Sequence, residues 1–160
     1  MKHCFKLADL TATQKLAQNI ASVIVPNFVI ILNGNLGAGK TTLVREILQT
    51  LGVSGRIKSP SFTLVEPYAI KRFNHAYHFD LYRFEDADEW FYAGFDEYFN
   101  PQAQNIFFIE WAQKALQLIP WQDWQIDIDL IDLHSRSIVI NALSGNGIQC
   151  LKQLIKNVEI

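Results

Sequence analysis

Residues 34–41 read Gly-Asn-Leu-Gly-Ala-Gly-Lys-Thr and match the pattern G-x-x-x-x-G-K-[ST] without a gap. In loops of this pattern the glycines permit a tight bend, so that consecutive backbone N–H groups point at phosphate oxygens. The pattern predicts that Lys40 neutralises the β- and γ-phosphates of a nucleotide and that the Thr41 hydroxyl meets Mg²⁺. Thr42 either contacts the α-phosphate or is an ordinary helix residue. The predicted nucleotide-binding residues are Asn35, Leu36, Gly37, Ala38, Gly39, Lys40, Thr41 and Thr42.

A phosphate-binding loop of this kind lies between a buried strand and a helix. Residues 28–32 are an unbroken apolar run rich in β-branched side chains, which is typical of a strand buried on both faces of a parallel sheet. Residues 40–51 place apolar side chains at helical spacing, and Gly52 can end that helix. We therefore expect an α/β fold that is P-loop NTPase-like, with a central, largely parallel sheet, antiparallel hairpins and flanking helices.

The rest of the chain predicts the other elements of one domain over residues 1–160, since no repeat or linker interrupts it. Pro67 indicates an edge strand, and Asp9, Thr11 or Thr13 can cap the first helix. The predicted elements are a helix at 10–24, a hairpin of strands 63–70 and 76–82, a short helix at 86–92 capped by Asp86, a strand at 105–109, a hairpin of strands 126–130 and 137–142, and a helix from about 146.

Two acidic residues are candidates for the metal site, because Mg²⁺ needs one or two protein oxygens besides that of Thr41. Glu110 follows an apolar strand, and at the carboxyl end of that strand it would face the ion across the sheet edge. The alternative is a surface carboxylate at a strand end. Asp80 could hold a metal-bound water, orient the attacking water, or serve a turn or salt bridge. Both acids remain candidates, and we interpret the nearby His78 as a packed, hydrogen-bonded imidazole.

Charge is distributed unevenly along the 160 residues, whose formal net charge is −2. Residues 1–74 carry nine Lys and Arg against three Asp and Glu, whereas residues 75–133 carry two against twelve. The small total excludes a polybasic protein that binds nucleic acid or membranes through its overall charge. The acidic middle is either a surface that faces a metal or a partner, or a solvated face.

The two cysteines and the apolar runs indicate the cellular setting. Cys4 and Cys150 lie near opposite ends with no Cys/His cluster, so we expect no structural zinc, no disulfide framework and two buried, inert thiols. No apolar run approaches the length of a membrane span, and the N-terminus has no signal-peptide core. A cytoplasmic protein is expected.

Several other function classes fit the residues less well. The chain has no N-K-x-D motif, which disfavours a GTPase. Small-molecule kinases of this fold need several lid arginines, but residues 75–133 hold only Arg83 and Lys114. Since no arginine is evidently placed as a finger, activation in trans by a partner is expected.

Two further features leave alternatives open. A dense group of aromatic residues beside acids is either a partner interface or core packing; its members are Trp90, Phe91, Tyr92, Phe95, Tyr98 and Phe99. A module that senses ATP without useful hydrolysis also fits the loop. Direct RNA binding is a weaker alternative that rests on Arg56, Lys58, Lys71 and Arg72.

Five segments together resemble one known family more specifically than the loop does alone. They are L-N-G-N-L-G-A-G-K-T-T at 32–42, K-S-P-S-F-T-L-V-E-P-Y at 58–68, H-F-D-L-Y-R at 78–83, Gly94 with D-E-Y-F at 96–99, and I-E-W at 109–111. In this order and spacing the chain resembles the TsaE (YjeE) family, bacterial P-loop ATPases required for making threonylcarbamoyladenosine in tRNA. Residues 120–160 match that family only in general character.

The resemblance implies an ATPase that binds ATP or ADP, is weakly active alone, and works with the partner proteins TsaB and TsaD. Contact with tRNA would be indirect or weak, and the chain would not itself transfer the threonylcarbamoyl group. It also implies that Thr41 and Glu110 hold Mg²⁺, that Asp80 assists hydrolysis, and that Trp111 lies near the site.

A second loop would act, by the same resemblance, as a switch-like segment that senses the nucleotide. Its residues are Ser59, Pro60, Ser61 and Phe62. Two positions depart from the family's pattern: Ser61 stands where Thr or a similar residue is usual, and Asn35 stands where Asp is usual. Ser61 keeps a hydroxyl, whereas Asn35 lacks a charge that the family has beside the phosphates.

Overall fold

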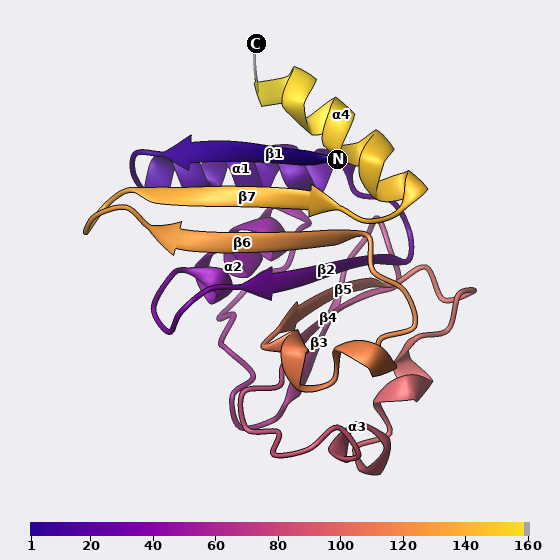
Figure 1. The fold of residues 1–160 in the computed structure, drawn as a ribbon. Helices are drawn as coiled ribbons and strands as arrows, with labels where there is room; N and C mark the ends of the chain where they lie inside the picture. The colour runs from indigo at the N-terminus through magenta and orange to yellow at the C-terminus, as the bar shows by residue number, and fades with distance from the viewer. Residues whose placement is uncertain (159–160) are drawn as a thin grey trace.

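A seven-stranded sheet in the order β1-β7-β6-β2-β5-β4-β3 runs through a computed structural model that describes residues 1–158 (Figure 1). The four central strands β6, β2, β5 and β4 pair in parallel, and the outer pairs are antiparallel. This arrangement confirms the predicted α/β fold. The strands are β1 (Lys2–Leu7), β2 (Phe28–Asn33), β3 (Val65–Ala69), β4 (His75–Asp80), β5 (Ile106–Glu110), β6 (Trp124–Leu130) and β7 (Arg136–Ala142).

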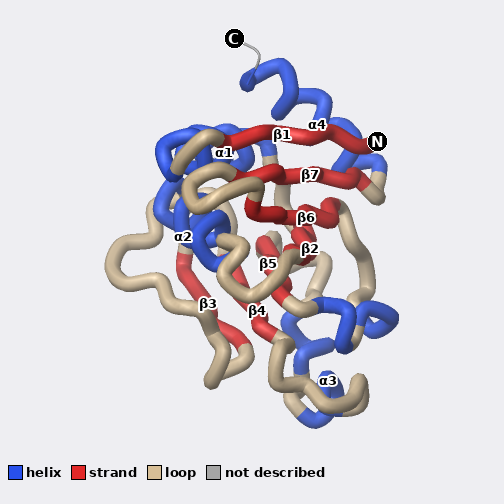
Figure 2. Tube along the Cα trace, turned by 60° about the vertical axis from the view of Figure 1, so that its left-hand side comes forward, coloured by secondary structure: helices blue, strands red, loops and turns tan. Residues whose placement is uncertain are grey.

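Helices cover both faces of this sheet. Figure 2 shows α1 and α2 on one side of the strands and α3 on the other. The side chain of Asp9 caps α1 by accepting the N–H of Ala12 at 2.8 Å, as one of the three predicted caps would. The short helix predicted from 86 begins at Glu89 and has Asp88 as its N-cap residue, without a side-chain capping bond. Asp86 lies in the turn before it and accepts the N–H of Asp88 and of Glu89. The helices are α1 (Leu10–Val23), α2 (Lys40–Thr50), α3 (Glu89–Tyr92) and α4 (Gly145–Val158), with short 3-10 helices at Phe95–Tyr98, Ala112–Lys114 and Leu116–Leu118.

Two hydrophobic cores lie on opposite faces of β2, because successive side chains of a strand point to opposite faces. Phe28, Ile30 and Leu32 pack in the core shared with α1, α2 and α4. Val29 and Ile31 pack in the second core, which is rich in aromatic rings. The continuous apolar run predicted this burial on both faces. Packing in both cores holds β2 in place at the start of the loop that follows it.

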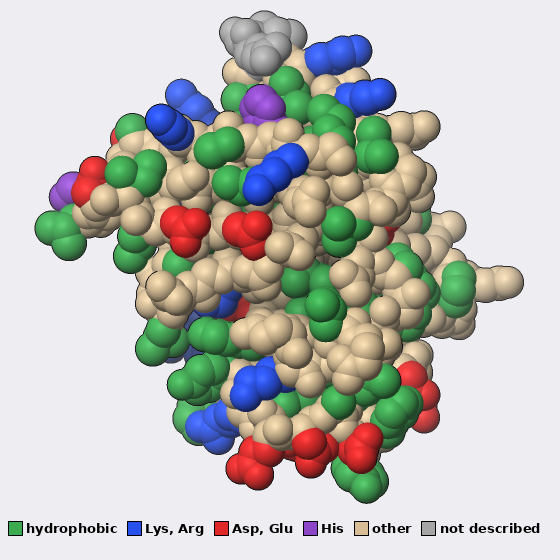
Figure 3. Space-filling view, viewed as in Figure 1, with side chains coloured by type: hydrophobic (Ala, Val, Ile, Leu, Met, Phe, Trp, Pro, Cys, Tyr) green, Lys and Arg blue, Asp and Glu red, His purple; other side chains and the backbone are tan. Residues whose placement is uncertain are grey.

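The aromatic group of residues 90–99 is divided between core and surface. Trp90, Phe95 and Phe99 are buried in the second core. Phe91 and Tyr92 of α3 are 56% and 86% exposed. Acidic side chains gather at the lower end of the molecule in Figure 3, the end at which α3 lies in Figure 1. Core packing therefore accounts for these three rings and in part for the half-buried Tyr98, which packs against the same core. The exposed Phe91 and Tyr92 remain available to an interface. The exposed acids of this region are Glu85, Asp86, Asp88, Asp96 and Glu97.

The N-terminal strand and one cysteine differ from the sequence-based predictions. Strand β1 was not predicted; it pairs with β7 at the edge of the sheet, with Phe5 opposite Ile138. Cys4 lies on the face of β1 that the helices leave uncovered, so the prediction of a buried thiol is wrong there.

The other cysteine, Cys150, is buried as predicted. Its thiol donates to the carbonyl of Val23 at 3.1 Å, and burial raises the pKa of that thiol. No helix in residues 1–158 has the length and apolarity needed to cross a bilayer.

The packing of α4 gives a stability prediction. A Cβ added at Gly147 would overlap the backbone carbonyl oxygen of Asp123, whereas one added at Gly145 would meet nothing within 4 Å. We expect Gly147→Ala to lower the free energy of unfolding by about 1–3 kcal/mol, the usual effect of overpacking. Gly145→Ala is the matched control and should leave stability unchanged or slightly raised. Urea denaturation of both variants tests this; equal stability of the two would contradict the observed packing.

Candidate functional site

The glycine loop occupies residues 34–39, between the end of β2 and the first residue of α2. A Cβ at Gly34 would lie 2.6 Å from the carbonyl oxygen of Ile128 in β6, so a larger residue would displace the loop or the strand. Gly39 has φ +110°, in the left-handed region that side chains disfavour. The loop conformation thus depends on glycine at both positions, as the motif predicted.

Backbone donors of the loop are available to a ligand. Among the described residues 1–158, the N–H groups of Leu36, Gly37 and Gly39 donate no hydrogen bond. Helix α2 begins immediately afterwards and directs the positive end of its dipole at the same place. An anion such as a phosphate satisfies donors of this kind at a helix N-terminus.

Lys40 lies under this loop with 5% of its surface exposed. Its ammonium donates to the carbonyl oxygens of Gly34 at 2.7 Å and Asn35 at 3.1 Å. The same ammonium lies 4.5 Å from the centroid of the Trp111 ring. These contacts place the positive charge within the loop and next to the cavity, where it can exchange carbonyl partners for phosphate oxygens.

Trp111 is brought to Lys40 by an unusual backbone conformation. It follows Glu110, the last residue of β5, and has φ +59°. A bulky residue in the left-handed region is an outlier and commonly marks a functional site. The bend turns the indole out of the strand and over the lysine. The sequence-based placement of Trp111 beside the site is consistent with this geometry.

Thr41 and Glu110 meet at the carboxyl end of the parallel strands. Strands β2 and β5 pair with Leu32 opposite Glu110, which places this acid beside the loop that follows β2. The Thr41 hydroxyl donates to Glu110 Oε1 at 2.8 Å. Glu110 is 3% exposed, so its charge requires partners within the protein. The expected position of the acid, across the sheet edge from the threonine, is the one observed.

His78 provides a second partner for the Glu110 carboxylate. Its Nε2 lies 2.9 Å from Glu110 Oε1, and its side chain is fully buried. This agrees with the predicted packed, hydrogen-bonded imidazole. His78 and Asp80 occupy alternate positions of β4 and therefore face the same side of the sheet. The alternation of side chains along β4 was the signal in the sequence that His78 lies on the same face as Asp80, near Glu110.

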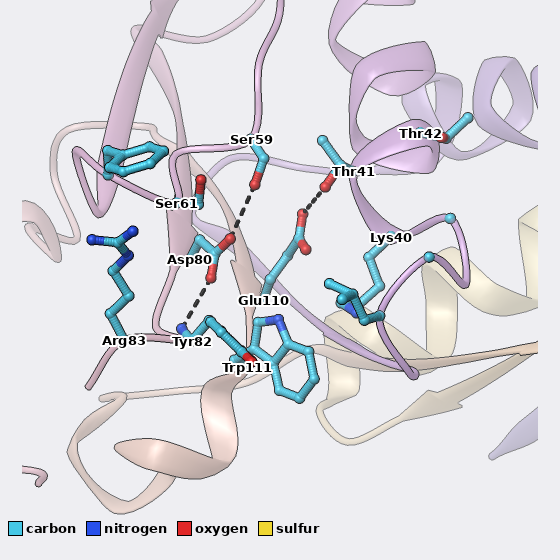
Figure 4. A pocket seen from close by; sticks show the side chains of 14 residues that line it. Lys40, Thr41, Thr42, Ser59, Ser61, Asp80, Tyr82, Arg83, Glu110 and Trp111 are labelled. Atoms are coloured by element: carbon cyan, nitrogen blue, oxygen red, sulfur yellow. Dashed lines mark hydrogen bonds between the residues drawn. The ribbon is translucent and has the colours of Figure 1, made fainter. Parts of the chain in front are cut away.

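Asp80 ties the switch-like segment to the site. Strands β4 and β5 pair with Asp80 directly opposite Glu110. The hydroxyl of Ser59 donates to Asp80 Oδ2 at 3.0 Å, and the backbone N–H of Tyr82 donates to Oδ1 at 2.9 Å. The turn interpretation of Asp80 is therefore correct, and the residue also lies in the site (Figure 4). A nucleotide that moved Ser59 would break one of these bonds.

One cavity of about 470 Å³ joins these groups, a volume within the usual range for a bound small molecule. Twelve of the fifteen predicted site residues line it. Asn35 is exposed outside it, Ala38 is buried in the core with α2, and the buried Pro60 accepts the N–H of Leu64 through its carbonyl. The lining residues are Leu36, Gly37, Gly39, Lys40, Thr41, Thr42, Ser59, Ser61, Phe62, Asp80, Tyr82, Arg83, Glu110 and Trp111.

Two arginines near the loop were not predicted as site residues. Arg83 lines the cavity from the turn after β4. Arg136 reaches the loop from β7, and its Nε donates to the carbonyl oxygen of Ala38 at 3.1 Å. Arg83 lies three residues beyond Asp80, so proximity along the chain was a usable signal. Arg136 comes from 98 residues away, and no local pattern identifies it.

The donor set fits Mg²⁺ bound together with phosphates. The described residues contain no cluster of three or more His, Cys, Asp or Glu side chains able to hold a metal by themselves. Mg²⁺ in nucleotide sites is commonly held by one or two protein oxygens, substrate phosphates and water. The adjacent oxygens of Thr41 and Glu110 match that requirement.

Known proteins with similar sequences and structures indicate the family. The family model described as "Threonylcarbamoyl adenosine biosynthesis protein TsaE" matches residues 7–138. The chain is 44% identical over 119 residues to the tRNA threonylcarbamoyladenosine biosynthesis protein TsaE of Haemophilus influenzae, covering 74% of this chain and 73% of that protein. It is 35% identical over 143 residues to the protein of that name from Rickettsia felis, covering 88% and 81%. A crystal structure of Bacillus subtilis YdiB matches with a TM-score of 0.82 and 26% identity, covering 99% of this chain and 97% of that one. The chain therefore belongs to the TsaE family.

Proposed function

We propose that this protein is a Mg²⁺-dependent ATPase that supports threonylcarbamoyladenosine formation in tRNA together with TsaD-like and TsaB-like proteins. The observation that carries the proposal is the hydrogen bond from Thr41 to Glu110, which joins the first turn of α2 to a buried acid that lines the cavity. The two relatives described above are tRNA threonylcarbamoyladenosine biosynthesis proteins, which supports a role in this modification. The contact with tRNA would be indirect or weak.

The residues of the cavity have complementary roles in this proposal. The loop N–H groups and Lys40 would bind the phosphates, and Thr41 with Glu110 would hold Mg²⁺. Mg²⁺, when bound by these two residues, would neutralise part of the phosphate charge. Asp80 or Glu110 would orient the attacking water. Hydrolysis of this kind depends on positioning and electrostatic stabilisation, which a preorganised loop provides.

The second loop would couple the nucleotide to partner proteins. Ser59 contacts Asp80, while Ser61 and Phe62 line the cavity, so a bound γ-phosphate would lie against this loop. Order in a loop that contacts the γ-phosphate is lost on hydrolysis in other nucleotide switches. We infer that this loop becomes ordered when ATP binds and is released on hydrolysis, and that this change drives conformational change in the modification assembly.

A nucleotide-gated module that binds ATP without useful hydrolysis is the second candidate. It is favoured by the hydrogen bonding of Asp80, both of whose carboxylate oxygens already accept bonds from the protein. A carboxylate engaged in this way is less able to orient water. Tight ATP binding with no turnover under any partner condition would support this candidate.

The proposed role in tRNA modification can be tested in cells in which this chain replaces the resident TsaE. We expect wild-type threonylcarbamoyladenosine levels with the natural chain and loss of the modification with Lys40→Ala, because the loop would no longer hold phosphates. Mass spectrometry of digested tRNA gives the modified fraction, and immunoblotting confirms equal protein levels. Normal modification in cells that carry only Lys40→Ala would overturn the proposal.

Trp111 offers a spectroscopic prediction of nucleotide binding. Its ring lies 4.5 Å from the Lys40 ammonium, which must turn toward phosphates when they bind. We expect MgATP to change the tryptophan emission of the wild-type protein. Trp111→Phe should lose most of that change while Trp121→Phe, altered at an indole outside the cavity, keeps it. An unchanged signal in Trp111→Phe would contradict the assignment of this ring to the site.

A further inference from the structure

We propose that Arg83 is a catalytic residue that supplies, from within this chain, a second positive charge to the phosphoryl group during ATP hydrolysis. This inference rests on the proposed ATPase function and deepens it. It is carried by the position of Arg83, a residue that lines the same cavity as Lys40 and whose guanidinium lies against the exposed ring of Phe62 rather than against an acid. The sequence alone indicated no arginine finger.

The backbone that carries Arg83 is anchored on both sides. Before it, the N–H of Leu81 donates to the carbonyl oxygen of Glu110 at 3.0 Å, and the N–H of Tyr82 donates to Asp80. After it, Phe84 is buried, and its N–H donates to the carbonyl of Leu81 at 3.0 Å. The turn is therefore held to both acids of the site, while the Arg83 side chain itself is exposed.

The contacts of the guanidinium leave it able to move. Its Cζ lies 4.3 Å from the centroid of the Phe62 ring, and Phe62 is 81% exposed. Within residues 1–158, Arg83 forms no salt bridge and no side-chain hydrogen bond. A cation–π contact at an exposed site is weak, whereas a bidentate bond between guanidinium and phosphate is strong. A phosphate in the cavity would therefore compete effectively with Phe62 for this side chain.

Arg83 and Lys40 bring positive charge to different sides of the cavity. Among the described residues 1–158, Lys40 and Arg83 are the only cations that line the cavity, and they lie on opposite sides of Asp80 and Glu110 (Figure 4). Lys40 follows the glycine loop and would bind the β- and γ-phosphates from its own side of the cavity. Arg83 would then approach the terminal phosphate and the attacking water from the other side. Arg136 is less suited to this role, because its guanidinium already donates to the carbonyl oxygens of Ala38 and His134.

The chemical step explains why a second cation matters. The water oxygen bonds to the γ-phosphorus while the bond from that phosphorus to the β–γ bridging oxygen breaks. The electron pair of the broken bond leaves with ADP, and a water proton is released to solvent. Charge develops on the equatorial and bridging oxygens in the transition state, and an arginine that contacts them accelerates hydrolysis strongly. The expected effect therefore falls on turnover more than on nucleotide binding.

The test compares Arg83→Ala and Arg83→Lys with wild type, using the purified full chain alone and with TsaB and TsaD. Arg45→Ala is the matched control, because Arg45 is a half-buried arginine of α2 that lies outside the cavity. We expect single-turnover hydrolysis to fall about 100-fold or more in Arg83→Ala and less in Arg83→Lys, with the Kd for MgADP unchanged within about threefold. Guanidinium ion at a non-denaturing concentration should partly restore Arg83→Ala, which it would not do for a merely structural role.

The outcomes separate this inference from the proposed function. Equal turnover in Arg83→Ala and wild type, both above the Lys40→Ala blank, would overturn the role of Arg83 and leave the ATPase standing. A loss of MgADP affinity equal to the loss of turnover would also overturn it, since Arg83 would then only bind nucleotide. If wild type does not exceed the Lys40→Ala blank, the proposed ATPase fails and the inference fails with it.

Discussion

Lys40→Ala is expected to weaken binding of MgATP by about 100-fold or more. Lys40 directly follows the glycine loop, and its ammonium donates to the carbonyl oxygens of Gly34 and Asn35 within that loop. Losing a charged hydrogen bond to phosphate costs about 3 kcal/mol, which corresponds to a factor of about 100 in Kd. Isothermal titration calorimetry with MgATP measures this change directly.

A matched lysine variant separates this effect from a general loss of charge. Lys152 is exposed on α4, away from the cavity, and Lys152→Ala should bind MgATP as wild type does. Circular dichroism and Tm should show that Lys40→Ala stays folded, because its lost bonds lie within one loop. An affinity of Lys40→Ala within about threefold of wild type would show that the loop does not bind the phosphates.

Glu110→Gln is expected to lower ATP turnover by about 10²- to 10³-fold, which is typical for removal of one electrostatic group from an active site. The substitution keeps the shape of the side chain and an oxygen that can accept from Thr41, but it removes the negative charge that would face Mg²⁺. We therefore also expect half-maximal activity to require more Mg²⁺. Turnover measured across a range of Mg²⁺ concentrations tests both effects.

Two further variants make this second prediction specific. Glu97 is an exposed acid outside the cavity, and Glu97→Gln should leave turnover and the Mg²⁺ requirement unchanged. Asp80→Asn should lower turnover with less effect on the Mg²⁺ requirement, because Asp80 bonds to Ser59 and not to Thr41. A raised Mg²⁺ requirement in Asp80→Asn with none in Glu110→Gln would reverse the roles assigned to the two acids.

The parts of the site that a local pattern encodes could be predicted from the sequence. The strand, glycine loop and helix around Lys40 are contiguous in the chain. Each has its own local signal: an unbroken apolar run, a glycine motif and apolar side chains at helical spacing. The place of Glu110 followed from a general rule, since parallel strands present their carboxyl ends at one edge of the sheet. Pro67 correctly indicated that β3 lies at the edge.

Features that depend on contacts between distant segments could not be predicted in this way. Arg136 reaches the glycine loop because β7 pairs with β6. The sequence around the glycine loop contains no information about the register of that pairing. Strand β1 is stabilised by pairing with β7, so its short sequence carried too weak a signal. Arg83 is a different case, because it lies only three residues beyond Asp80 and its proximity along the chain was a signal that the prediction did not use.

The most direct test of the central claim is ATP turnover by the purified protein, measured alone and with TsaB and TsaD, with Lys40→Ala as the blank. The Thr41–Glu110 junction beneath the cavity predicts Mg²⁺-dependent turnover that is low alone, rises when the partners are added, and is absent in the blank. Turnover indistinguishable from the Lys40→Ala blank, both alone and with the partners, would contradict an ATPase and favour a nucleotide-gated module.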